Sequence, residues 1–139
     1  MNHQISVIIP VLNEEAYIGK LLEYLIANSS SKNISDIIVV DGGSNDNTPN
    51  IIKAFTKCHN TENKKALHYN DGHILETETT TLNIKTKFLL LHSEKGRAKQ
   101  MNLGAKHANG EILYFLHADS FPPKYFDELI IKEIQKENL

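Results

Sequence analysis

Two glycines directly follow an aspartate at the end of an apolar run, in the segment Asp41-Gly42-Gly43. A carboxylate in this place can accept hydrogen bonds from a nucleotide base or a ribose. The glycines allow a ligand to approach the backbone closely and tolerate positive φ angles. The same residues could instead form a structural turn, in which Asp41 accepts bonds from the amides that follow. The spacing alone leaves both interpretations open.

A histidine and an aspartate lie two residues apart in His117-Ala118-Asp119, after another apolar run. If a strand continued through them, both side chains would point to the same side. A carboxylate suits Mg²⁺ or Mn²⁺, and the imidazole nitrogen favours Mn²⁺ of the two. Such a metal would neutralise a diphosphate leaving group. The alternative is that Asp119 caps a turn before Pro122, while His117 is a partly buried structural histidine.

Residues near two predicted helix starts could bind the rest of a nucleotide. The segment Lys95-Gly96-Arg97 precedes a predicted helix, and a helix N-terminus with an arginine is a natural phosphate site. A solvated basic turn is the alternative. Glu14 could contact a ribose or favour the helix end near it, and Asn102 could face a cleft or the solvent. His92, at a strand end, is interpreted as structural.

Four apolar runs must position these residues, and each run is predicted to be a buried β-strand. Segments with helical spacing alternate with the runs, which predicts a Rossmann-like α/β fold, a mostly parallel sheet with helices on both faces. Ligands of such sheets bind outside the carboxyl ends of the strands, and all four of those places are polar here. The predicted strands are 5–11, 36–40, 88–91 and 112–116, and the polar segments are 10–14, 41–46, 92–97 and 117–120.

Capping residues and apolar faces define the predicted helices. Asn13 is predicted to cap the first helix and Thr48 the second, and Gly110 is predicted to end the third in the left-handed conformation. The last helix is predicted to open at Pro122-Pro123. The inward residues are predicted to be Ala98, Met101, Ala105 and Ala108 in the third helix, and Phe126, Leu129, Ile130 and Ile134 in the last.

The composition fits a single soluble domain with a polar insertion. Hydrophobic residues make up 40% and charged residues 23%, and the net charge of -2 gives no support for nucleic-acid binding. Residues 56–87 show neither the helical nor the strand pattern of apolar residues. They are predicted to be a surface insertion, with a loose hairpin as one option. The single cysteine, Cys58, cannot form an internal disulfide. No signal peptide and no membrane-spanning segment is recognised, so a cytoplasmic location is expected, with peripheral membrane contact left open.

Four stretches together resemble family 2 glycosyltransferases of the GT-A fold. Each is modest alone, but they occur in the family's order and each lies at a strand end. The ending Leu-His-Ala-Asp and the segment Gly-Arg-x-x-Gln-Met-Asn further resemble a bacterial branch associated with radical-SAM and selenium-domain proteins. The four stretches are 6–15, 38–48, 96–105 and 110–120.

The resemblance implies a nucleotide-sugar site that uses Mn²⁺ or Mg²⁺. Asp41 would hold the base, usually uracil, with Gly42-Gly43 and Asp46 close to it. Asp119 would bind the metal, and His117 replaces the first aspartate of the family's Asp-x-Asp motif, as a second metal or nucleotide contact. The other residues expected to border the nucleotide are Pro10, Asn13, Glu14, Arg97 and Ala118.

Members of this family continue past the metal motif into an acceptor half with the catalytic base, whereas this chain stops about twenty residues after Asp119. The expected function is metal-dependent, inverting transfer of a sugar, with a UDP-sugar as first candidate, to an unidentified acceptor. One alternative is a nucleotide-binding fragment or split-enzyme half without activity of its own. Another is a ligand-free interaction scaffold. An apolar surface left by the missing half could bind a separate carboxy-terminal partner or a second copy.

Overall fold

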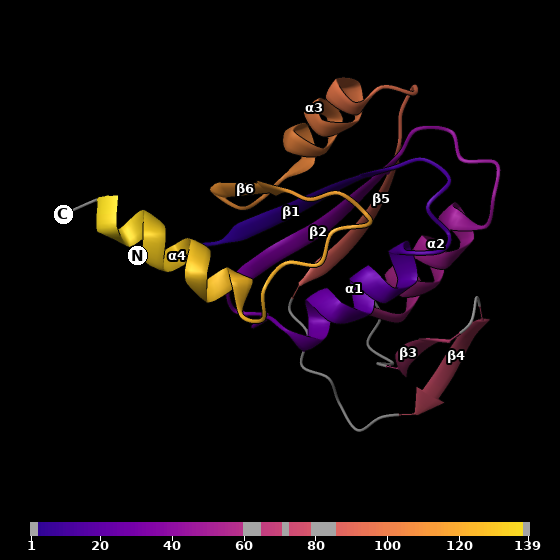
Figure 1. Ribbon diagram of the computed structural model, residues 1–139, viewed down its shortest axis with the longest axis horizontal. Coiled ribbons are helices and arrows are strands. Elements are labelled where there is room, and N and C mark those ends of the chain that lie inside the picture. The colour runs from indigo at the N-terminus through magenta and orange to yellow at the C-terminus, as the bar shows by residue number, and fades with distance from the viewer. Residues whose placement is uncertain (1–2, 60–64, 71–72, 79–85, 138–139) are drawn as a thin grey trace.

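The structure, a computed structural model, describes residues 3–59, 65–70, 73–78 and 86–137, with the backbone alone at 65–70, 73–78 and 137. At its centre is a parallel sheet of four strands in the order β5-β2-β1-β6 (Figure 1). The predicted α/β fold class is therefore confirmed. The strands are β1 (Ile5–Val11), β2 (Ile34–Asp41), β5 (Lys87–His92) and β6 (Ile112–Phe115), and the helices are α1 (Ile18–Ala27), α2 (Thr48–His59), α3 (Arg97–His107) and α4 (Phe126–Glu137).

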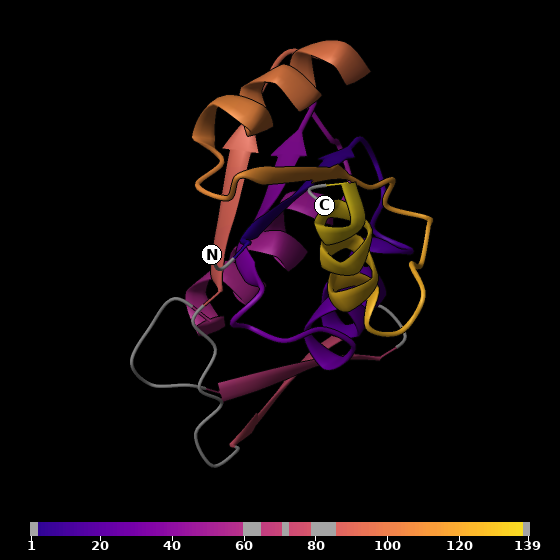
Figure 2. The same cartoon turned by 90° about the vertical axis from the view of Figure 1, so that its left-hand side faces the viewer.

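Helices cover both faces of the sheet, as buried parallel strands require. Figure 2 shows α3 on one side of the sheet and α1 and α2 on the other. Val7, Ile37 and Phe88 lie at matching register positions and face the larger core, under α1 and α2. Ile8 and Ile38 face the smaller core, under α3. Burial on both faces explains why β1 and β2 read as unbroken apolar runs. The prediction of a buried strand is wrong for β6, where Leu113 and Phe115 are each 42% exposed.

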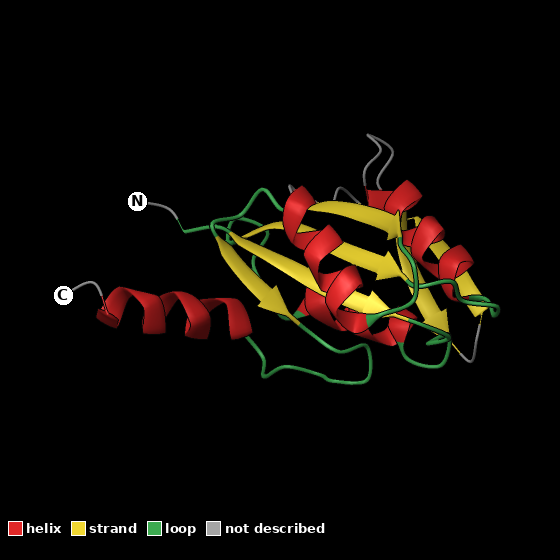
Figure 3. Ribbon diagram, turned by 90° about the horizontal axis from the view of Figure 1, so that it is seen from above, coloured by secondary structure: helices red, strands yellow, loops and turns green. Residues whose placement is uncertain are grey.

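The last helix, α4, lies beyond the end of the sheet from which the strands start (Figure 3). Its buried Asp127 accepts the N–H of Ser30 at 3.0 Å and the side-chain amide of Asn33 at 2.9 Å. These bonds tie the helix to the loop between α1 and β2. The helix begins after Pro122-Pro123 and not at it, and Leu129, predicted to point inward, is 51% exposed.

Two predicted helix signals have other roles. Helix α1 begins at Ile18, so Asn13 does not cap it. Asn13 instead has a left-handed backbone with φ of 53°, and its Oδ1 accepts the N–H of Asn45 at 2.8 Å. Gly110 is not left-handed, contrary to the prediction. It lies so close to β1 that a Cβ atom there would be 2.7 Å from the backbone nitrogen of Ser6.

The inner face of α3 differs from the prediction. Its buried residues are Gln100 and Gly104, whereas Ala98 is exposed. Ala105 and Ala108 pack against the smaller core as predicted. The glycine brings the helix close to the sheet, because a Cβ atom on Gly104 would lie 2.6 Å from a side-chain methyl of β1.

The segment predicted as an insertion contains a pair of strands. The strands β3 (Lys65–Asn70) and β4 (His73–Glu78) form a separate antiparallel sheet. Helix α2 extends to His59, so residues 56–59 are helical and do not belong to the insertion. Residues 60–64, 71–72 and 79–85 lie outside the described part of the chain. Among the helices that the structure describes, none is both long enough and apolar enough to cross a membrane.

His59 closes α2 inside the core and makes the stability of the fold depend on pH. Its ring stacks on Phe55 at a centroid distance of 5.9 Å and lies 5.0 Å from the ring of Phe88. Burial lowers the pKa of the imidazole below its usual 6.5, because the charged form would lose its hydration. Just below this usual value the unfolded chain binds the proton more readily than the folded one. The stability contributed by neutral His59 is therefore complete above about pH 6.5 and declines as the pH falls toward the lowered value.

We expect His59→Phe to remove this part of the acid sensitivity while it keeps the ring contacts. Urea unfolding at about pH 7.5 and about pH 5.5 should show a smaller loss of unfolding free energy in the variant than in the wild type. His107→Phe, at an exposed histidine of α3, is the matched control and should lose as much as the wild type. Equal losses in His59→Phe and the wild type would contradict the prediction.

Candidate functional site

The loops that follow the four parallel strands lie at the carboxyl edge of the sheet, where the arrowheads of Figure 1 point. Hydrogen bonds in both directions connect the first two loops. The N–H of Asn13 donates to Ser44 Oγ at 2.8 Å, and the N–H of Asn45 donates to Asn13 Oδ1 at 2.8 Å. The N–H of Glu14 donates to the hydroxyl of Thr48 at 2.9 Å. The loops after β1 and β2 therefore form one connected unit.

Asp46 organises the turn that enters α2. Its carboxylate accepts the N–H of Thr48 at 2.9 Å and also the Thr48 hydroxyl, and it accepts the N–H of Glu15 at 3.3 Å. Partial burial acts to raise the pKa of the Asp46 carboxyl, but the pKa is lowered overall because these hydrogen bonds favour the charged form. The carboxylate of Asp46, and not the predicted Thr48 side chain, thus binds the first N–H of α2.

Asp41 ends β2 with a side chain that is almost fully buried, at 3% exposure for the residue. Its carboxylate accepts the N–H of Gly43 at 3.2 Å, and the N–H and hydroxyl of Ser44. Gly43 has φ of 102°, in the region that favours glycine. The described contacts therefore show the structural turn that the sequence left open as an alternative, with Asp41 accepting hydrogen bonds from the residues that follow it. Binding of a base by Asp41 stays a proposal.

Gln100, a residue of the Gly-Arg-x-x-Gln-Met-Asn segment to which the sequence assigned no role, lies beneath this turn. Its side chain is buried, and its Nε2 donates to the carbonyl oxygens of Val11 and Val40, each at 2.9 Å. Its Oε1 accepts the N–H of Gly96 at 3.4 Å. A Cβ atom on Gly42 would lie 2.9 Å from this carboxamide, so any larger residue there would displace the Gln100 side chain. A glutamine in a helical segment is typical of a solvent-facing position, and only the packing of α3 reveals that this one is buried.

The loop after β5 reaches the same edge. The N–H of Ser93 donates to the Asp41 carbonyl at 2.9 Å. His92, predicted to be structural, is mostly exposed, and its Nδ1 lies 3.7 Å from Asp41 Oδ2. Arg97 is the first residue of α3 and is exposed. Arg97 therefore belongs to the helix end whose unpaired N–H groups carry partial positive charge.

Strand β6 ends at Phe115, so the premise that a strand continues through His117 is wrong. His117 and Asp119 are nevertheless both exposed, because they alternate with residues that point inward. Leu116 and Ala118 belong to the larger core. Ala118, predicted to border the nucleotide, can therefore offer a ligand only its backbone.

Negative charge collects where the loops after β1 and β6 approach each other. Burial raises the pKa of Glu14, and the charges of Asp119 and Asp46 raise it further. A divalent cation would relieve this repulsion. No set of three or more His, Cys, Asp or Glu side chains converges on a metal position within the described residues. A cation bound by Asp119 and His117 would have to take its other ligands from water and phosphate oxygens, as Mg²⁺ commonly does.

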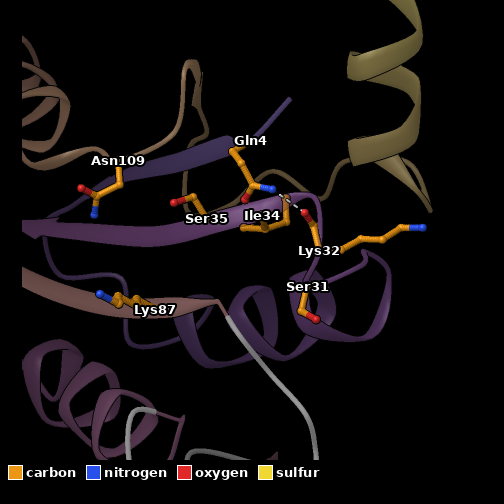
Figure 4. A pocket seen from close by; sticks show the side chains of 7 residues that line it. All are labelled: Gln4, Ser31, Lys32, Ile34, Ser35, Lys87 and Asn109. Atoms are coloured by element: carbon orange, nitrogen blue, oxygen red, sulfur yellow. Dashed lines mark hydrogen bonds between the residues drawn. The ribbon is translucent and has the colours of Figure 1, made fainter. Parts of the chain in front are cut away.

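A hollow of about 460 Å³ lies at the opposite, amino edge of the sheet (Figure 4). Its amide side chains already make structural bonds. Gln4 Nε2 donates to the carbonyl of Lys32 at 2.6 Å, and Asn109 Nδ2 donates to Asp36 Oδ2 at 3.1 Å. The Lys32 side chain points away from the other labelled residues. The carboxyl edge is therefore the better candidate for a ligand site.

A parallel sheet with helices on both faces and polar loops at its carboxyl edge defines an α/β domain of the class that binds ligands at that edge. The comparison with protein families makes the assignment specific. The model of glycosyl transferase family 2 matches residues 6–139, so the chain belongs to this family.

Relatives of known function agree with the family. The chain is 30% identical over 132 residues to the dolichyl N-acetyl-alpha-D-glucosaminyl phosphate 3-beta-D-2,3-diacetamido-2,3-dideoxy-beta-D-glucuronosyltransferase of Methanococcus voltae, covering 95% of this chain and 34% of the relative. It is 28% identical over 130 residues to the undecaprenyl-phosphate 4-deoxy-4-formamido-L-arabinose transferase of Shewanella sediminis, covering 92% and 32%. The chain thus spans about a third of the length of these curated relatives.

Solved structures show the same fold. The crystal structure of S. aureus TarS 1–349 in complex with UDP matches with a TM-score of 0.65 and 22% identity, over 96% of this chain and 32% of that one. The mannosyltransferase PcManGT from Pyrobaculum calidifontis, in complex with GDP-Man and Mn²⁺, matches with a TM-score of 0.62 and 21% identity, over 88% and 29%. At these identities the likeness establishes a GT-A-like fold.

Proposed function

We propose that this chain binds the nucleotide-sugar donor of a glycosyltransferase at the carboxyl edge of its sheet. The observation that carries the proposal is the position of four polar strand-end loops at one edge of a parallel sheet, in a chain of this family. These loops offer a buried carboxylate, glycine backbone, an exposed arginine and an exposed carboxylate. Those groups match the base, the ribose and the diphosphate of a nucleotide sugar.

The base and ribose are assigned to the loops after β1 and β2. Asp41 and the backbone of Gly42-Gly43 would receive the base, with UDP as first candidate and GDP as second. Glu14 would border the ribose, because its loop is bonded to the turn that enters α2. The remaining residues proposed to border the nucleoside are Pro10, Asn13, Asp46 and the backbone of Ala118.

The diphosphate is assigned to the loops after β5 and β6. Asp119 and His117 would hold Mn²⁺ or Mg²⁺, which would supply the positive charge that stabilises a diphosphate leaving group. Arg97, at the positive end of α3, would add a second cationic contact. Burial is the main cause of the raised pKa of Glu14, but Asp119 and Asp46 raise it further, so a cation at Asp119 would have carboxylates of two other loops near it.

The wider proposal is inverting transfer by a longer or two-part enzyme, with residues 1–139 as its single donor-binding domain and 56–87 as the polar insertion. The acceptor is unassigned, and no described carboxylate is proposed as the base. The segments Gly96–Asn102 and Leu116–Asp119 support membership of the branch associated with radical-SAM and selenium-domain proteins. If the chain is one half of a split enzyme, sugar transfer should appear only when a separate acceptor half is added.

Calorimetric titration with UDP and with GDP, each in Mn²⁺ and in EDTA, tests the proposal. We expect saturable binding of one nucleotide that weakens about tenfold in EDTA, and Asp119→Asn should bind at the EDTA level whether or not metal is present. Glu128→Gln, at an exposed carboxylate of α4, should behave as the wild type. Equal binding with and without EDTA would reject the metal. Failure of both nucleotides to bind would favour the ligand-free scaffold.

A further inference from the structure

The carboxamide of Gln100 joins three segments of the candidate site. Its NH₂ group donates to the carbonyl oxygens of Val11 and Val40, so both of its hydrogens are used. Its Oε1 accepts the N–H of Gly96. Val11 ends β1, Val40 is the penultimate residue of β2, and Gly96 immediately precedes α3. One buried side chain thus links the ends of two central strands to the start of a helix on the sheet's face.

The Asp41 turn rests directly on this carboxamide. Val11 O accepts the N–H of Gly42 at 3.0 Å as well as the Gln100 amide, so the two groups share one acceptor. A Cβ atom on Gly42 would come within 2.9 Å of both Cδ and Oε1 of Gln100. The turn therefore cannot shift toward α3 without displacing Gln100. If the carboxamide were removed, the turn would lose the group on which it packs and could move.

We propose that Gln100 is a positioning residue of the donor site, which fixes the Asp41 turn relative to Arg97. Asp41 follows Val40 directly, and Arg97 follows Gly96 directly, so each end of the Gln100 network lies one peptide from a proposed nucleotide contact. The expected effect of Gln100 on nucleotide affinity rests on the proposed function. The hydrogen bonds that hold the Asp41 turn do not depend on any ligand.

Gln100→Met tests this, because it keeps the length of the side chain and removes all three hydrogen bonds. The matched control is Thr86→Val, since the buried Thr86 hydroxyl donates to the carbonyl of Ile34 at 2.8 Å, at the opposite end of the same β2 strand. Both variants lose a buried bond to a strand carbonyl. A merely structural role of Gln100 predicts that they behave alike.

The first readout is amide hydrogen exchange by NMR, without ligand. We expect Gln100→Met to speed exchange at Gly42 and Gly96 by about tenfold or more, while amides at the centre of β1 and β2 keep their relative protection. Thr86→Val should leave Gly42 and Gly96 unchanged. Uniform acceleration across the sheet in Gln100→Met, or equal acceleration at Gly42 in both variants, would overturn the proposal.

The second readout is the affinity for the nucleotide that the wild type binds, measured in the presence of the same metal. Gln100→Met should bind about tenfold more weakly, and Gly42→Ala should reproduce that loss because its methyl displaces the same carboxamide. Thr86→Val should bind as the wild type, and equal losses in it and Gln100→Met would overturn the inference. If the wild type binds neither UDP nor GDP, the proposed function fails, and the exchange data alone decide the positioning role of Gln100.

Discussion

Replacing Asp41 by asparagine is expected to weaken nucleotide binding about 100-fold, because a carboxylate that accepts several hydrogen bonds is replaced by a group that also donates. The new NH₂ would face the N–H of Gly43 or Ser44, which now donate to the carboxylate. The turn would lose part of its support and a base would lose its charged acceptor. Calorimetric titration with UDP in Mn²⁺ measures the change in affinity.

A second buried aspartate of β2 provides the matched control for Asp41→Asn. Asp36 lies near the other end of the strand and accepts the backbone N–H and side-chain amide of Asn109, each at 3.1 Å. Asp36→Asn should lower the free energy of unfolding by about 1–3 kcal/mol, as loss of a buried acceptor does, without changing nucleotide affinity. If Asp41→Asn keeps the wild-type affinity while it loses stability, Asp41 only forms its turn.

The central strands could be predicted from the sequence because their burial produces a recognisable run of apolar residues. Strands that are covered on both faces need apolar residues at successive positions, so β1 and β2 are visible without knowledge of their neighbours. The rule that ligands bind at the carboxyl ends then placed the candidate residues at one edge. The structure brings the loops of Asn13, Asp41 and Arg97 to that edge as the rule requires.

The contacts between the loops could not be predicted, because they join residues distant in the sequence. Asn13 looks like a helix cap, but its side chain binds the N–H of Asn45, and such a partner has no local signature. Asp46 takes the capping role at α2 instead. The burial of Gln100 was missed for the same reason, since its acceptors lie on two other strands.

Glycine is ambiguous in sequence, because it serves both positive φ angles and close packing. Gly43 has the left-handed conformation that its turn predicts, at φ of 102°. Gly110 follows Asn109 in a typical helix stop, yet its backbone is not left-handed. Helix α3 ends instead at His107, and the capping residue Ala108 has extended dihedral angles. The role of Gly110 is to let the chain pass against β1, and that need arises only when β6 is paired with β1.

Gly110→Ala is therefore expected to cost about 3 kcal/mol of unfolding free energy, at the upper end of the range for overpacking. A Cβ atom there would lie 2.7 Å from Ser6 N and 2.8 Å from the carbonyl oxygen of Gln4. Both are backbone atoms of the neighbouring segment and cannot rotate away as a side chain could. The N–H of Gly110 also donates to Ser6 Oγ at 2.8 Å, so a shift of the chain would stretch that bond as well. Urea unfolding at neutral pH measures the loss.

Gly104→Ala is the informative comparison, because it adds the same methyl group against side chains. Its Cβ atom would lie 2.6 Å from Ile8 Cγ2 and 3.2 Å from Val40 Cγ2, which can move by small changes in the packing of α3 on the sheet. Alanine also favours the helix by about 1 kcal/mol over glycine, which offsets part of the clash. The loss should thus be smaller at Gly104 than at Gly110. The reverse order, or a loss below about 1 kcal/mol at Gly110, would mean that β6 can move away from β1 at little cost. Because β6 leads directly to His117 and Asp119, such freedom would also leave the proposed metal ligands without a fixed position.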